Sequence, residues 1–66
     1  MVNITRCDKR KKNGKAFYIV HAVDDKGYTG NCVCSIAYGD KLLAASPESL
    51  YIGWNRENNK SFLYIK

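Results

Sequence analysis

The segment KAFYIVHAVD, residues Lys15–Asp24, is the clearest indication of a β-sheet fold, because it has the pattern of one long β-strand with apolar side chains on both faces. Side chains alternate between the two faces of a strand. One face therefore carries Phe17, Ile19, His21 and Val23, and the other carries Tyr18, Val20 and Ala22. Since both sets are largely apolar, we expect either a central strand covered on both sides or a strand with a binding surface on one face.

The residues before this stretch predict a hairpin. Asn13-Gly14 is a strong turn signal, and we expect a first strand over Val2–Cys7 followed by a loop over Asp8–Gly14. After the central stretch, Asp25-Lys26-Gly27 predicts a tight turn.

Tyr28–Tyr38 has the cleanest period-two alternation in the chain and predicts a long third strand. Its Cys32 and Cys34 side chains would point to the same side. Gly30 within it suggests a bulge or a sharp bend, as small barrels require.

The remaining elements are shorter. Gly39–Ala45 is compatible with a short helix capped by Asp40 or with the tail of a strand. Ser46–Ser49 predicts a turn, or one helical turn with Pro47 at its first position. Strands are expected over Leu50–Asn55 and Ser61–Ile65, with a polar hairpin loop between them.

These elements predict a mainly all-β fold, a small five-stranded antiparallel barrel that is OB-like or SH3-like, with one short helical turn. Residues 1–66 would form one domain. A chain of this length removes only about 60% of its unfolded surface from water, so its core is small. A homodimer or a bound partner would add buried surface.

The charge distribution is uneven. The net charge is +5, and six of the ten residues from Arg6 to Lys15 are Lys or Arg. This basic segment leads directly into an aromatic strand. Cations neutralise phosphates and release counterions, and aromatic rings stack on unpaired bases, so the combination indicates a single-stranded nucleic acid as partner. The alternative is a hairpin arm whose lysines serve only solubility.

Composition also bears on the compartment. The chain has no apolar run of about 18 residues, so we expect no membrane partner. Its N-terminus lacks the apolar segment of a signal peptide, and three cysteines in a short chain argue against a disulfide framework. We expect the cytoplasm of a bacterial cell or of a phage-infected host.

The chain contains the residue types of a zinc site, since Cys7 and His21 accompany the Cys32-x-Cys34 pair. This spacing is not that of a zinc knuckle, and small thiols in a strand core are the more common arrangement. His21 lacks an accompanying catalytic motif and is expected as a hydrogen-bonded strand histidine. We expect no metal, no cofactor and no enzymatic activity.

The order of these features resembles the OB-fold single-stranded-DNA-binding proteins, most of all the small ones of filamentous phages. The resemblance is carried by a Gly-Lys-x-aromatic entry into a strand, an aromatic just after a hairpin turn, a Pro-containing turn before an aromatic strand, and a closing strand. These are Asn13–Ile19, Asp24–Tyr28, Ser46–Ile52 and Phe62–Ile65. The chain is shorter than the family, and its third strand carries two cysteines where the family varies.

The resemblance implies binding of single-stranded DNA, or of RNA, without strong sequence preference. Phosphates would lie against Arg6, Lys9, Arg10, Lys11, Lys12 and Lys15. Bases would stack on Phe17, Tyr18 and Tyr28, with Tyr51 and Trp54 as further candidates and Tyr18 as the first choice. The alternative function is that of a small phage or mobile-element protein that binds and inhibits a host protein through a strand edge or a charged loop.

Overall fold

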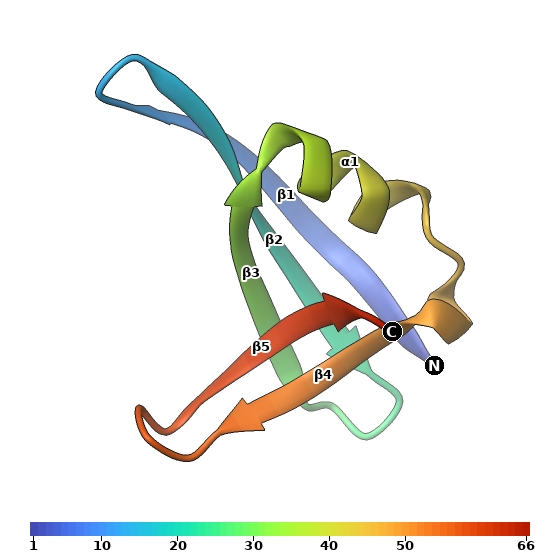
Figure 1. Ribbon diagram of the computed structural model, residues 1–66. Coiled ribbons are helices and arrows are strands. Elements are labelled where there is room, and N and C mark those ends of the chain that lie inside the picture. The colour runs from blue at the N-terminus through green and yellow to red at the C-terminus, as the bar shows by residue number, and fades with distance from the viewer.

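The computed structural model describes residues 1–66 as a sheet with a short helix packed against one side (Figure 1). The elements in chain order are β1 (Val2–Lys12), β2 (Lys15–Asp24), β3 (Thr29–Ser35), α1 (Ile36–Ala44), the 3-10 turn η1 (Pro47–Ser49), β4 (Leu50–Asn55) and β5 (Lys60–Ile65). The expected mainly β, five-stranded, barrel-like domain with a short helical turn is confirmed.

The five strands form one sheet in the order β1-β2-β3-β5-β4. The β1–β2, β2–β3 and β4–β5 ladders are antiparallel, whereas β3 and β5 run parallel and are paired through Asn31 and Phe62. The chain passes from β3 through α1 and η1 before β4, which is how β5 comes to lie parallel to β3. One pair in the barrel thus departs from the antiparallel arrangement expected.

The basic segment is part of a long β-hairpin rather than a loop. β1 continues to Lys12, and its ladder with β2 extends to the Lys12–Lys15 pair. Asn13 and Gly14 both have positive φ, 52° and 77°, so a two-residue turn closes the hairpin. The expected loop over Asp8–Gly14 is therefore wrong except at this turn, and Figure 1 shows the hairpin projecting beyond the body of the molecule.

The third strand is shorter than its sequence pattern suggests. β3 ends at Ser35, whose Oγ accepts a hydrogen bond of 3.2 Å from the backbone N–H of Tyr38 and caps α1. The helix therefore starts at Ile36 and not at Asp40, and the predicted strand over Tyr28–Tyr38 is wrong beyond Ser35. η1 begins at Pro47, as the sequence predicts.

The core lies between the inner side of the sheet and α1. Its buried apolar residues are Val2, Val20, Ala22, Leu42, Leu50 and Leu63. Gly30 is also buried, and a Cβ there would lie 3.0 Å from a side-chain carbon of Ile52, so this glycine permits a close approach of β4 to β3. Of the bulge or sharp bend expected at Gly30, the β2–β3 register shows no bulge, and a register shift occurs instead in β1, between Ile4 and Arg6. No helix of the structure has the length and apolarity to cross a bilayer.

Candidate nucleic-acid interface

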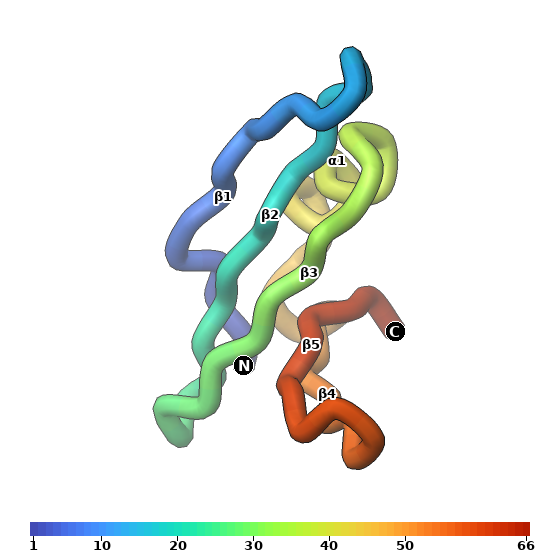
Figure 2. Tube along the Cα trace, turned by 90° about the vertical axis from the view of Figure 1, so that its left-hand side faces the viewer, coloured from blue at the N-terminus to red at the C-terminus, as the bar shows by residue number.

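The side of the sheet turned away from α1 carries a continuous row of exposed and half-exposed side chains, which we call the outer face. In Figure 2 β1, β2 and β3 lie in front of the helix, so this side is turned towards the reader. Strand alternation and cross-strand pairing assign to it Phe17, Ile19, His21, Asn31, Val33, Tyr51, Phe62 and Tyr64. Val33 and Phe62 retain 69% and 41% of their exposure, unusually high for apolar side chains near the middle of a sheet.

Three aromatic rings of the outer face form a row across β4 and β5. The ring centroids of Phe62 and Tyr64 are 5.4 Å apart, with 34° between the ring planes, and those of Tyr64 and Tyr51 are 5.8 Å apart, with 28° between the ring planes. The Lys66 ammonium lies 5.0 Å from the Tyr51 centroid and ends the row with a cation. Because the rings support one another, they offer a fixed platform of the kind on which bases stack.

A chain of polar side chains crosses the outer face from β1 to β3. Arg6 Nε donates a hydrogen bond of 2.9 Å to Asp8 Oδ1, and Asp8 Oδ2 lies 3.7 Å from His21 Nε2. His21 Nδ1 is 2.8 Å from Asn31 Oδ1. The expected hydrogen-bonded strand histidine is confirmed. Since Asn31 pairs with Phe62, this polar chain ends beside the aromatic row.

The predicted phosphate-binding residues separate onto two sides of the β1–β2 hairpin. Arg10 faces across to Phe17 and Lys12 to Lys15, on the side of the outer face, and Arg6 joins them through its pairing with His21. Lys9 pairs with Tyr18 and Lys11 with Ala16, so both point to the helix side. The basic groups that accompany the outer face are therefore Arg6, Arg10, Lys12 and Lys15.

Tyr18, the first choice for base stacking, lies on the inner side of β2. Its ring packs so closely on α1 that a Cβ at Gly39 would overlap it. Loss of hydration, followed by the nearby Asp40 carboxylate and Cys7 thiol, raises the pKa of the Tyr18 hydroxyl. The structure thus gives Tyr18 a packing role, while Phe17 and Tyr51 lie on the outer face.

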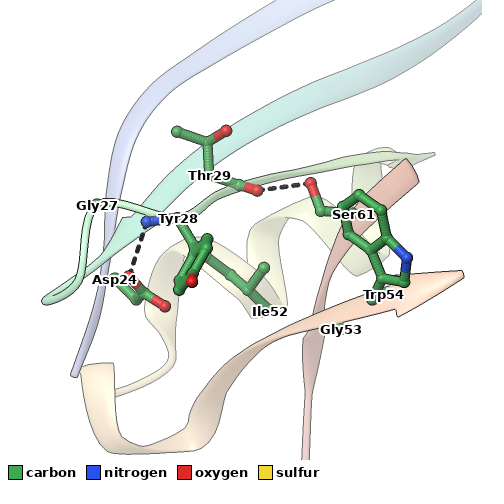
Figure 3. Close-up of a pocket in the computed structure, with 8 residues that line it drawn as sticks. All are labelled: Asp24, Gly27, Tyr28, Thr29, Ile52, Gly53, Trp54 and Ser61. Carbon is green, nitrogen blue, oxygen red and sulfur yellow. Dashed lines mark hydrogen bonds between the residues drawn. The ribbon is translucent and has the colours of Figure 1, made fainter. Parts of the chain in front are cut away.

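Tyr28 and Trp54 lie apart from the basic hairpin, at the other end of β2. They retain 66% and 59% of their exposure and flank a pocket of about 420 Å³ (Figure 3). Asp24 also lines this pocket, and its Oδ1 accepts hydrogen bonds of 2.9 Å from the backbone N–H groups of Lys26 and Tyr28. A carboxylate beside the two rings disfavours an approaching phosphate backbone.

The three cysteines are free, and each packs against the core from the inner side of the sheet. Loss of hydration, reinforced by the Cys32 and Cys7 thiols, raises the pKa of the Cys34 thiol to about 11. This thiol is therefore protonated near neutral pH, in contrast to the thiolate that metal binding or nucleophilic attack requires. The structure contains no group of three His, Cys, Asp or Glu side chains arranged to hold a metal ion.

Sequence reasoning missed the residues that complete the outer face, namely Asn31, Val33, Phe62 and Tyr64. A signal for two of them exists, since alternation in Ser61–Ile65 places Phe62 and Tyr64 opposite the buried Leu63.

Comparisons of the chain with protein-family models, with curated proteins and with solved structures find no match.

Proposed function

We propose that this chain binds single-stranded DNA or RNA across its outer face, largely without regard to sequence. The observation that carries the proposal is the row of aromatic and apolar side chains that runs from the half-exposed Phe17 to the exposed Val33, Phe62 and Tyr51. Every base has an aromatic face, so such a row accepts any sequence, and each good stack contributes about 1–3 kcal/mol.

Charge supports the same ligand. Arg10, Lys12 and Lys15 stand at the Phe17 end of the row, and Lys66 stands at the Tyr51 end. A strand laid along the row would meet cations at both ends while its bases face the rings. Phosphate contacts of this kind release counterions, so the binding should weaken as salt is raised.

The strand topology also supports the proposal that the outer face binds a single-stranded nucleic acid. The strand order β1-β2-β3-β5-β4, with the helix between β3 and β4, supports the OB-like alternative of the two barrel types expected. In OB-like barrels the face of strands two and three, together with the β1–β2 and β4–β5 loops, binds oligonucleotides. Here β2 and β3 contribute Phe17, Ile19 and Val33 to the outer face.

The test is a titration of a fluorescein-labelled oligo-dT with the protein, followed by anisotropy, beside a duplex of equal length at low and moderate salt. We expect oligo-dT to bind more tightly than the duplex and to lose affinity with salt. The matched variants are Phe62→Ala, on the outer face, and Leu43→Ala, which removes another exposed apolar side chain from α1. Absence of oligo-dT binding, or equal loss in both variants, would contradict the proposal.

A second candidate, binding and inhibition of a host protein, is favoured by the two ends of the sheet. β1 and β4 each have a neighbour on one side only, and no ladder joins them. An open edge can accept a strand from another protein. The same free edges are available to the homodimer that the small core suggests, which remains a prediction for sedimentation equilibrium to measure.

A further inference from the structure

The polar chain on the outer face borders a pocket whose mostly polar lining does not belong to the stacking row. The pocket has a volume of about 440 Å³ and is lined by Thr5, Arg6, His21, Ala22, Thr29 and Asn31. It lies beside the aromatic row, since Asn31 is the residue of β3 that pairs with Phe62. A base stacked near Phe62 would therefore have polar side chains within reach of its edge.

Arg6 is the first of these polar groups, and it is held in place. Its Nε–H is engaged by Asp8 Oδ1 at 2.9 Å, which leaves the four hydrogens of its two Nη atoms unbound by any protein group. The side chain keeps 68% of its exposure, so these hydrogens are open to a ligand. A guanidinium fixed by a carboxylate loses less conformational freedom when it binds two acceptors side by side.

Asn31 is the second group. Its Oδ1 is engaged by His21 Nδ1 at 2.8 Å, which leaves the amide hydrogens free. Arg6 and Asn31 thus both offer donors to the pocket. A base edge with two adjacent acceptors would suit these donors.

We propose that this pocket gives the protein a preference for guanine at one position of a bound single strand. Guanine presents two adjacent acceptors, N7 and O6, which match an arginine fork. On the corresponding edge, adenine places an amino donor beside N7, cytosine presents an amino donor, and thymine has a single acceptor beside a methyl group. The inference rests on the proposed function, because the pocket reads a base only when a strand lies on the outer face.

The experiment compares four oligonucleotides of equal length by competition against labelled oligo-dT. One is all thymine, and the others carry guanine, adenine or 7-deazaguanine at one central position. A strand can shift along the stacking row until its single guanine reaches the pocket. We expect the guanine strand to bind roughly fivefold to 100-fold more tightly than the all-thymine strand. The 7-deaza strand, which lacks the N7 acceptor, should lose most of this gain.

The protein variants are Arg6→Lys and the control Arg10→Lys, both on the outer side of β1 and both keeping the charge. Arg6→Lys should abolish the difference in affinity between the guanine strand and the all-thymine strand, whereas Arg10→Lys should retain this difference. Equal affinity of the wild type for all four strands, or a preference that survives Arg6→Lys, would overturn the inference and leave the proposed function standing. Failure of every strand to bind would overturn both.

Discussion

The ring of Phe62 lies directly over Gly53, its partner in the β4–β5 ladder. A Cβ at Gly53 would lie 2.6 Å from the ring carbon Cζ, so only glycine allows the ring this position. In this position the ring lies beside Tyr64 on the outer face, with 5.4 Å between the ring centroids and an angle of 34° between the ring planes.

Gly53→Ala should therefore weaken oligo-dT binding, because the added methyl group displaces the Phe62 ring from the row. Anisotropy titration measures the effect, and a double-mutant cycle identifies its cause. In a Phe62→Ala background the methyl group has no ring to displace, so Gly53→Ala should then change affinity little. An equal loss of affinity in both backgrounds would show that the glycine acts by another route.

Phe62 and Leu63 are neighbours in β5 with opposite roles. Phe62 is 41% exposed and Leu63 only 2% exposed. Phe62→Ala should cost about 1–3 kcal/mol of binding free energy and little stability. Leu63→Ala should cost about 2–5 kcal/mol of unfolding free energy. Urea unfolding and oligo-dT titration of both variants check whether Phe62 serves binding and Leu63 serves stability. A large loss of unfolding free energy in Phe62→Ala would contradict this assignment.

Gly39→Ala should destabilise the protein by about 1–3 kcal/mol, although alanine is the better helix former. The reason is the Tyr18 ring, which occupies the space that the new methyl group needs. Lys41→Ala, at an exposed position of the same helix, is the control and should change the unfolding free energy little. Thermal or urea unfolding measures both, and a stabilised Gly39→Ala variant would show that Tyr18 moves aside freely.

The two sides of the basic hairpin should differ in their contribution to binding. Arg10 and Lys12 accompany the outer face, while Lys9 and Lys11 point to the helix side. Replacing Arg10 and Lys12 by Gln should lower the magnitude of the slope of log K against log salt by about 1.4, at about 0.7 for each phosphate that is no longer neutralised. The Lys9 and Lys11 pair, with the same charge change in the same strand, should lower it less. A larger effect of the helix-side pair would place the phosphates on that side.

Stability should fall at high pH. The pKa of Cys34 is raised from 9.0 to about 11 in the folded chain, so folding favours the protonated thiol. Its contribution is fully present below pH 9 and is lost as pH rises through about 11. Urea unfolding across this window should show a steeper decline for the wild type than for Cys34→Ala. Some decline should persist in the variant, since the pKa of Tyr18 is raised as well.

The sequence predicts well those features that local pattern determines. Alternation in Lys15–Asp24 assigns Phe17 to one face and Tyr18 to the other, as observed. It fails at Ile36 and Tyr38, where the alternation continues although the backbone has become helical. The Ser35 cap and the packing of Gly39 against Tyr18 favour the helix there, and the second of these is a tertiary contact that no local pattern contains.

The candidate site shows the same difference between local and tertiary determinants. The resemblance to single-stranded-DNA-binding proteins makes Phe17 and Tyr51 candidates for base stacking, and the structure places both on the outer face. The sequence does not place Phe62 beside Asn31, because this position depends on the parallel pairing of two strands far apart in the chain. The nearby basic segment favours Tyr18 as a stacking residue, but adjacency in sequence does not decide which side of a strand faces solvent.

The parallel pairing of β3 with β5 rests on one register pair, Asn31 with Phe62, and on a side-chain hydrogen bond of 2.5 Å from Ser61 to the Thr29 carbonyl. On either side of this junction, antiparallel ladders hold β1–β2–β3 and β4–β5 together along their lengths. Local opening is easiest where few bonds must break, so the junction is the seam at which the sheet parts first. The outer face crosses this β3–β5 junction, so a ligand bound on the outer face would hold the two antiparallel parts of the sheet together. Binding should then slow amide hydrogen exchange at Asn31 and Phe62 more than within β1–β2–β3 or within β4–β5.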